Sequence, residues 1–331
     1  MWNSSPGQLL LVPTWKLSWP ALIWMSLTSN QIASPKIRPD SEKYMSLSTN
    51  QAESPGLPVL SGRQFRLWED MLENRTGVRI AAQRKDYIRS QIAKRMSEGG
   101  WIDADSYFRE VLETLAGPRE WGILLDRLLV KETLFFRHQA SHDYVCKRIA
   151  ELAGDHPLPF NLWSAGCASG EEAYSLAVDV SEGLAIAGQA NNYYIVGTDV
   201  STDAITAARE GVYPESYFDN VPTVLKQNYF SHTDERNLKI IAPVRKKVAF
   251  LAGNLLEKPK QYVNQMDLIF CQNVLVYFKQ WRRRDIINFF QECLKPGGCL
   301  IIGPGELTGW EPENMERLDV PGIQAYEKRY T

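Results

Sequence analysis

Residues 163–172 read W-S-A-G-C-A-S-G-E-E, a run of small residues that ends in the carboxylates of Glu171 and Glu172. Small residues at the start of a helix let a ligand approach the backbone. The run is not a phosphate loop, because no Gly-Lys-Ser/Thr follows it, and it lacks the G-x-G-x-x-G spacing of a dinucleotide loop. Two carboxylates would repel a phosphate and attract a positively charged ligand. Alternatively, both are first-turn acids that favour the helix dipole.

Other polar residues follow the next apolar segments of the chain. Asp199 in G-T-D-V-S (197–201) suits a bidentate hydrogen bond to ribose hydroxyls, or instead an N-cap or Asx turn at the next helix. Asn254 and Asn273 can each donate and accept hydrogen bonds, as adenine edges and amino-acid groups require, and each taken alone is typical of a turn. A nucleoside with a cationic end and no phosphate is S-adenosylmethionine. The combination therefore predicts a methyltransferase sheet that binds this cofactor.

Short apolar strands that alternate with helices must position these residues. We predict strands at 160–164, 193–198, 248–252, 267–271 and 299–303, and helices at 171–187, 202–210 and 282–294, the last closed by K-P-G-G (295–298). Such βαβ alternation indicates an α/β fold, a doubly wound, Rossmann-like sheet over 159–331. Ligands of such sheets bind at the carboxyl ends of the strands.

Three segments that differ in composition and hydrophobic pattern precede the sheet. Residues 61–135 predict a small all-helical domain, with apolar residues at helical spacing and a basic second helix at 79–96. A connecting helix or linker is expected at 136–158. Residues 1–60 contain a near-repeat, M-S-L-T-S-N-Q-I-A-S-P and M-S-L-S-T-N-Q-A-E-S-P, and their polar composition predicts a disordered tail.

Composition bounds the possible functions. The net charge of −2 gives no global basic field, which argues against nucleic acid as a partner. The five cysteines form no CxxC pair and indicate reduced thiols in a cytosol. No apolar run is long enough to span a bilayer. We therefore expect a cytoplasmic protein without direct membrane insertion, and we expect a monomer.

Five motifs in order resemble the CheR-type chemoreceptor glutamate methyltransferases. They are V-K-E-T-L-F-F-R (130–137), W-S-A-G-C-A-S-G-E-E-A-Y-S-L-A (163–177), G-T-D-V-S (197–201), N-L-L (254–256) and F-C-Q-N-V-L-V-Y-F (270–278). The resemblance covers about residues 62–328. It implies an enzyme that transfers methyl groups from S-adenosylmethionine to glutamates of the cytoplasmic signalling domain of chemoreceptors, which yields glutamate methyl esters for sensory adaptation and S-adenosylhomocysteine.

The resemblance also implies roles for single residues, carried over by motif. The cofactor site would comprise Lys131, Thr133, Arg137, Glu171, Asp199, Asn254, Leu255, Gln272 and Asn273. In this set Glu171 would meet the charged amino-acid portion of the cofactor and Asp199 the ribose, while Thr133 and Arg137 would close the pocket. Glu172 is left as a helix-start acid.

Three positions depart from the pattern that the resemblance implies. Lys131 stands where the family usually has Asn, Gln272 replaces a common Arg, and G-P-G-E (303–306) lacks the Ser or Thr usual before its Glu. These departures keep open a second hypothesis, a non-catalytic scaffold or sensor that binds S-adenosylmethionine in a chemosensory pathway.

Methyl transfer to a glutamate needs alignment and desolvation more than a strong base, since a carboxyl with a pKa of about 4 is ionised at neutral pH. Arg137 is a candidate catalytic residue because a guanidinium can grip a carboxylate bidentately, or it braces the domain junction in an ion pair. Tyr277 is the second candidate, or else a core residue. His138 and His142 stand four residues apart, but no third ligand is evident and we expect no metal.

Two features could recognise an acidic receptor. Six basic residues on the 79–96 helix suit acidic receptor helices, or simply form a solvated face. The resemblance places a receptor-docking insertion near 217–247.

Overall fold

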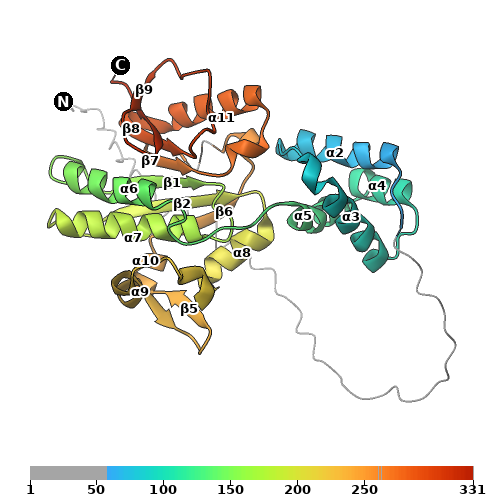
Figure 1. The fold of residues 1–331 in the computed structure, drawn as a ribbon, viewed down its shortest axis with the longest axis horizontal. Coiled ribbons are helices and arrows are strands. Elements are labelled where there is room, and N and C mark those ends of the chain that lie inside the picture. Colours follow the sequence, from blue (N-terminus) through green and yellow to red (C-terminus); the bar gives the residue numbers. More distant parts are fainter. Residues whose placement is uncertain (1–57, 260, 262, 331) are drawn as a thin grey trace, which may run out of the picture. The chain divides into compact units, whose positions relative to one another are not determined.

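The computed structural model describes residues 58–330 except 260 and 262 (Figure 1). The tail and near-repeat predicted for residues 1–60 lie, up to residue 57, outside the described residues. All elements below belong to one compact unit, Ser54–Thr331. None of the helices in the described ranges is long and apolar enough to cross a lipid bilayer.

Residues 58–128 fold into four α-helices around an apolar core, as the sequence predicts. They are α2 (Gly62–Thr76), α3 (Lys85–Gly99), α4 (Ala104–Glu113) and α5 (Gly117–Leu128), with the 3₁₀ turn η1 (Ala82–Arg84) before α3. Ser61 begins α2 with a capping box, and Gly77 ends it with a φ of 78°. The second helix begins at Lys85 and not at residue 79, so Arg79 lies in the loop before it.

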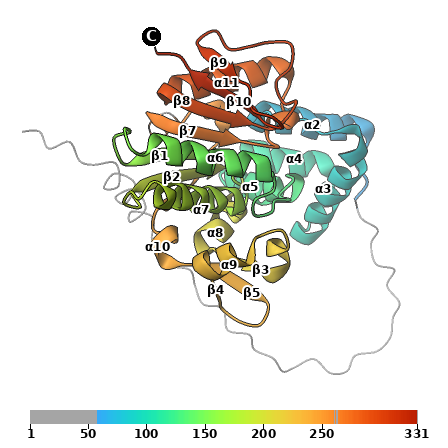
Figure 2. The same ribbon diagram turned by 60° about the vertical axis from the view of Figure 1, so that its left-hand side comes forward.

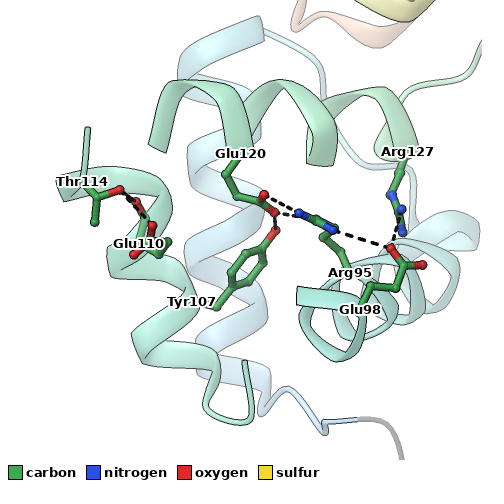
Figure 3. Close-up of polar contacts among 7 residues, drawn as sticks. All are labelled: Arg95, Glu98, Tyr107, Glu110, Thr114, Glu120 and Arg127. Atoms are coloured by element: carbon green, nitrogen blue, oxygen red, sulfur yellow. Dashed lines mark hydrogen bonds and ion pairs between the residues drawn. The ribbon is translucent and has the colours of Figure 1, made fainter. Parts of the chain in front are cut away.

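A buried carboxylate ties three of these helices together (Figure 3). Glu120 of α5 accepts hydrogen bonds from Arg95 Nε (2.7 Å) and Nη2 (2.6 Å) of α3 and from the Tyr107 hydroxyl (2.8 Å) of α4. Burial and the neighbouring Glu120 raise the pKa of Tyr107 far above its usual value. Since Glu120 is only 7% exposed, its charge depends on these partners, and Arg95 belongs to the interior of the helical domain.

The rest of the chain is built on a seven-stranded sheet of order β6-β2-β1-β7-β8-β10-β9. The strands are β1 (Phe160–Ala165), β2 (Tyr193–Asp199), β6 (Val248–Ala252), β7 (Met266–Cys271), β8 (Leu294–Ile302), β9 (Met315–Leu318) and β10 (Gln324–Lys328). The first five are the predicted strands and pair in parallel, whereas β10 pairs antiparallel with β8 and β9. The predicted fold class is confirmed, and the two-strand antiparallel edge is an addition.

The prediction that K-P-G-G (295–298) closes the last helix needs a correction. The helix ends at Cys293, and residues 295–298 lie inside β8. The ladder with β7 jumps from Met266↔Leu294 to Leu268↔Cys299, so these residues form a bulge. A bulge accommodates extra residues without ending a strand.

Helices cover both faces of the sheet (Figures 1 and 2). The principal ones are α6 (Gln139–Leu152), α7 (Glu171–Ile186), α8 (Thr202–Glu210) and α11 (Gln280–Cys293). Successive residues of β1 show the two layers, because Leu162 packs in the core beneath α7 while Trp163 meets the Phe290 ring of α11 at 5.1 Å. The turns between these strands and helices therefore gather at one edge of the sheet.

A small antiparallel sheet of order β3-β5-β4 is inserted between α8 and β6. It comprises β3 (Val212–Pro214), η2 (Glu215–Phe218), α9 (Thr223–Tyr229), β4 (Phe230–His232), β5 (Asn237–Ile240) and α10 (Ala242–Arg245). The Phe135 ring from the 130–137 motif stacks on Phe218 (4.5 Å) and meets Tyr213 and Phe230 edge-on. This aromatic cluster fixes the end of the motif that leads into α6.

Candidate active site

A cavity lies at the carboxyl ends of β1, β2, β6 and β7, beside residues 129–137 and the end of α2. The predicted site residues that line it are Thr133, Arg137, Asp199, Asn254, Leu255, Gln272, Asn273 and Tyr277. Lys131 and Glu171 do not line it. The lining residues that sequence reasoning did not propose include Glu172, His142, Thr76 and Val78.

The small residues of the 163–172 turn are required by close packing. Gly166 has a φ of 84°, and a Cβ there would overlap the Val274 side chain. Gly170 has a φ of 98°, and a Cβ there would lie 2.8 Å from Ala208 Cβ. Ala168 also has a positive φ, 46°, which is uncommon outside glycine and is found at strained functional turns. Small side chains thus let the turn pass between β7 and α8.

Asp199 forms a turn and also lines the cavity. Its carboxylate accepts hydrogen bonds from the Ser201 and Ala168 backbone N–H groups, both at 2.9 Å, so it forms an Asx turn. It also lines the cavity. Burial raises the pKa of Asp199, and the two backbone hydrogen bonds and the nearby Lys131 oppose that rise. The turn geometry holds the carboxylate toward the ligand space.

Lys131 interacts electrostatically with this carboxylate but does not line the cavity. Its Nζ is 3.2 Å from Asp126 Oδ1 in α5, and Asp126 also accepts a hydrogen bond from Ser201 Oγ. Lys131 therefore links the helical domain to the Asx turn at Asp199.

Of the two adjacent glutamates, the structure turns the second one toward the cavity. Glu171, predicted to meet the cofactor, is fully buried and does not line the cavity; both of its carboxylate oxygens lie 2.9 Å from Ser169 Oγ and share that hydroxyl as a donor. Glu172 lines the cavity and accepts a hydrogen bond of 2.7 Å from Ser164 Oγ. Successive helix residues point about 100° apart, so only one of the pair can face the ligand. From the sequence alone the two glutamates are equivalent, because both are acids in the first turn of the helix. Only the orientation of the helix shows which of them faces the cavity.

Burial raises the pKa of both acidic side chains that line the cavity, Glu172 and Asp199. It raises the pKa of Glu172 to about 8, an effect that Glu306 reinforces and Arg137 opposes. A carboxylate with a raised pKa is stabilised in its ionised form by a positively charged ligand. With Asp199 at the end of the adjacent strand, these two hydrogen-bond acceptors fit the ammonium and ribose hydroxyl groups of S-adenosylmethionine.

Arg137 and Tyr277, the two predicted catalytic residues, both line the cavity. Arg137 is exposed and donates to the Glu132 carbonyl (3.1 Å), and within the described residues it has no carboxylate at ion-pair distance, so the ion-pair alternative is not realised there. Tyr277 is half-buried on the short turn η4 (Leu275–Tyr277). Arg283 holds this turn by donating to the Val276 and Phe278 carbonyls.

The amide side chains differ in how freely they face the ligand space. Asn254 donates from Nδ2 to the Arg75 carbonyl of α2 (2.6 Å) and accepts from Leu256 N–H (3.0 Å). Gln272 donates to Ser141 Oγ (2.8 Å) and to a β8 carbonyl. Asn273, in contrast, is exposed and has a φ of 59°. Asn254 therefore also secures the helical domain at the rim of the cavity.

The two histidines considered as metal ligands have separate partners. His138 Nδ1 contacts Ser141 Oγ (2.8 Å), and His142 Nδ1 contacts Asp179 Oδ2 (2.6 Å). Across the ranges that the structure describes, no three His, Cys, Asp or Glu side chains are grouped to hold a metal ion.

Two family models match the chain. The model of the CheR methyltransferase SAM binding domain matches residues 131–321, and that of the CheR methyltransferase all-alpha domain matches residues 63–129. Both matches agree with the division into helical and sheet regions seen here.

Curated relatives carry related names. The chain is 29% identical to a chemotaxis protein methyltransferase of Salmonella typhimurium over 251 residues, 75% of this chain and 85% of the relative. It is 29% identical to one of Borreliella burgdorferi over 238 residues, 70% of this chain and 84% of the relative. It is also 30% identical to a probable biofilm formation methyltransferase, WspC, of Pseudomonas putida over 261 residues, 77% of this chain and 59% of the relative.

Proposed function

Because the chain belongs to the CheR methyltransferase family, and so is a methyltransferase that uses S-adenosylmethionine, we propose that it methylates glutamate side chains in the cytoplasmic signalling domain of chemoreceptors. The observation that carries this proposal is the presence in one cavity of the half-buried Glu172 carboxyl, whose pKa is raised, and of an exposed cation, Arg137. Glu172, once ionised, suits the positively charged cofactor, and the Arg137 cation suits an incoming carboxylate.

S-adenosylmethionine, when bound, would supply a sulfonium methyl group to an oxygen of the acceptor carboxylate, with S-adenosylhomocysteine as the leaving group. The chain's residues bind and align the partners. Glu172 would pair with the ammonium group and Asp199 would accept from the ribose hydroxyls. Leu255 and Asn273 would line the adenine and methionine sides.

Arg137 would orient the acceptor glutamate through its guanidinium, and Tyr277 would form part of the wall beside it. The acceptor is ionised near neutral pH, so neither residue has to remove a proton. Their contribution is alignment and exclusion of water.

The receptor would also contact the basic residues of the 79–96 segment. Arg79 and Lys94 are exposed, whereas other members of the set are engaged within the chain. Lys85 pairs with Glu69 (2.8 Å), and Arg95 is held by Glu120. The local positive field is thus weaker than the sequence indicates. The insertion expected near 217–247 corresponds to the small β3-β5-β4 sheet, which stays a proposed receptor contact.

Transfer of a labelled methyl group decides between an enzyme and a scaffold. The full chain would be incubated with methyl-labelled S-adenosylmethionine and a receptor cytoplasmic fragment. We expect label on the fragment that mild base releases as methanol, as for a glutamate methyl ester. Cofactor binding with no transfer to any receptor fragment would favour the scaffold hypothesis, and transfer to a base-stable position would exclude a carboxylate acceptor.

The role of Arg137 has its own test. Arg137→Lys keeps the charge but loses the bidentate grip, so we expect kcat/KM for the receptor to fall by tenfold or more, roughly the loss of one charge-assisted hydrogen bond. Arg127→Lys, at a residue paired with Glu98 outside the cavity lining, is the matched control. Equal effects of the two variants would contradict the assignment.

A further inference from the structure

The turn η4, which brings Tyr277 to the cavity, has little of its own to hold it in place. It is a single 3₁₀ turn of three residues, and the hydrogen-bond geometry of such turns is poorer than that of an α-helix. Leu275 is fully buried, but the next residue, Val276, is 50% exposed. The position of Tyr277 in the cavity wall therefore depends on contacts that other segments make with the backbone of the turn.

Two charged side chains from other segments bind this backbone. Glu306, in the loop after β8, accepts hydrogen bonds from Val276 N–H (3.2 Å) and Gly303 N–H (2.8 Å), one at each carboxylate oxygen. Arg283 of α11 donates to the carbonyls of Val276 (3.2 Å) and Phe278 (3.0 Å). Both polar backbone groups of Val276 are thus held by charged side chains.

Arg283 and Glu306, here called the η4 clamp, are also bonded to each other. Arg283 Nη1 donates to the Glu306 carbonyl at 2.9 Å, so that one guanidinium binds three backbone carbonyls. Glu306 is only 2% exposed, and a Cβ on Gly303 would lie 2.6 Å from its Oε2. Burial raises the pKa of Glu306, while the two backbone hydrogen bonds and the nearby Arg283 oppose that rise. The η4 clamp therefore joins the end of β8 and the first turn of α11 to η4.

The two arginines on either side of Arg283 have different surroundings. Arg282 lies over the Trp281 ring, 4.4 Å from its centroid, and Arg284 lies over the Trp310 ring at 5.7 Å. Within the part of the chain that the structure describes, neither of them donates a hydrogen bond to η4, whereas Arg283 donates two. The three adjacent arginines are thus not equivalent, and the outer ones supply matched controls.

Tyr277 is the residue on which these contacts act. It lies between the two residues of η4 whose carbonyls Arg283 binds, and its own carbonyl accepts a hydrogen bond from Arg79 N–H of the helical region (2.8 Å). Tyr277 lines the cavity, whereas Arg283 and Glu306 do not. We propose that Arg283 and Glu306 are positioning residues for methyl transfer, which act by holding Tyr277 in the wall beside the acceptor glutamate. The inference rests on the acceptor site of the proposed function.

A double-mutant cycle on methyl transfer tests whether Arg283 acts through Tyr277. Arg283→Lys keeps the positive charge but loses the fork of donors that binds several carbonyls at once. We expect kcat for a receptor fragment to fall by roughly tenfold or more, with KM within about threefold, because a displaced wall misaligns the bound acceptor. In a chain that already carries Tyr277→Ala, the same change should alter kcat by less than about twofold. Equal losses in both backgrounds would overturn the proposal.

Two further variants bound the role of the η4 clamp. Arg284→Lys is the matched control and should change kcat by less than about twofold; a loss as large as in Arg283→Lys would contradict the proposal. Glu306→Gln tests the other half of the clamp, because one carboxylate oxygen becomes an amide group that cannot accept a hydrogen bond. It should lower kcat in the same way, and an unchanged kcat would overturn the assignment of Glu306.

Hydrogen exchange provides a measurement that needs no methyl acceptor. Mass spectrometry of the full chain would follow the backbone amides of residues 276–278. Arg283→Lys should speed their exchange because the turn opens more often without the clamp, and Arg284→Lys should not. A parent chain that methylates no receptor fragment would contradict the proposed function, and exchange would then decide the inference alone. Unchanged exchange in Arg283→Lys would overturn the inference in either case.

Discussion

The backbone of Gly166 passes so close to Val274 that a Cβ at residue 166 would overlap Cγ2 of the valine. The contact joins the turn after β1 to the turn after β7, and both turns line the cavity. The distance between these two walls is therefore set by the absence of one methyl group.

Gly166→Ala should weaken S-adenosylhomocysteine binding by tenfold or more, because Val274 and the adjoining wall must move. Gly188→Ala is the control, since Gly188 also has a positive φ (65°) but nothing within 4 Å of its added Cβ. It should carry only the backbone cost, about 1–2 kcal/mol of stability. Calorimetric affinities and urea unfolding of both variants separate the two effects, and unchanged affinity in Gly166→Ala would refute the close-approach argument.

Substitution of the two glutamates of the turn should have different effects on the affinity for S-adenosylhomocysteine. Glu172→Gln removes the cavity anion and should weaken S-adenosylhomocysteine binding by roughly 10–100-fold, the range for a hydrogen bond to a charged group. Glu171→Gln should alter affinity less than threefold, because its carboxylate bonds to Ser169 and does not line the cavity. Calorimetry on both variants checks this, and a larger loss in Glu171→Gln would restore the original prediction.

Cofactor binding should release a proton near neutral pH. The pKa of about 8 for Glu172 means that the free carboxyl is largely protonated at pH 7, and it must ionise to pair with an ammonium group. The complex then binds fewer protons than the free protein, so affinity should rise from pH 6 to 7.5, by up to about tenfold per unit. Calorimetry in buffers of different ionisation enthalpy measures the released proton, and Glu172→Gln should abolish it.

The raised pKa also has a consequence for stability without cofactor. The folded state holds the Glu172 proton up to about pH 8, whereas the unfolded state loses it near pH 4.5, so this residue makes the fold less stable as pH rises between those values. Glu172→Gln should therefore raise Tm more at pH 8.5 than at pH 5. A Tm change independent of pH would contradict the assigned pKa.

Glu120→Gln should destabilise the helical domain. The change removes the charge that Arg95 needs in a buried site (Figure 3), and breaking a buried pair costs about 3–5 kcal/mol. Glu110→Gln, beside the exposed Thr114 in the same view, should stay within about 0.5 kcal/mol of the parent. Urea unfolding followed by tryptophan fluorescence compares them, because Trp68 and Trp101 both pack against Tyr107.

The sequence predicts the framework of this site well and its side-chain directions less well. The five parallel strands and the helices at 171–187 and 202–210 are confirmed because strong apolar periodicity and Gly turns mark them. Strands β9 and β10 were missed, since they are short, and β10 pairs with β8 across a loop that carries no strand signal.

The differences between the predicted site and the lining of the cavity have a common physical origin. Which of Glu171 and Glu172 faces the cavity depends on how α7 is oriented about its axis. That orientation is set by packing against α6 and the sheet, and it cannot be read from the types of the two residues. Likewise, His142 gives no signal of its own, because Asp179 is 37 residues away in the sequence. The family resemblance and the cofactor are confirmed, while the roles of individual site residues stay predictions.

Asn254 reaches from the sheet to the Arg75 carbonyl of α2, and Thr76 at the end of that helix lines the cavity. The helical segment is thus part of the binding wall as well as a candidate receptor contact. For protein evolution this means that the two regions cannot be exchanged independently between homologues. A chimera that combines the helical region of one relative with the sheet of another would have poorly fitting contacts at the edge of the cavity. To avoid this, the residues on both sides of the contact between α2 and the sheet would have to be exchanged together.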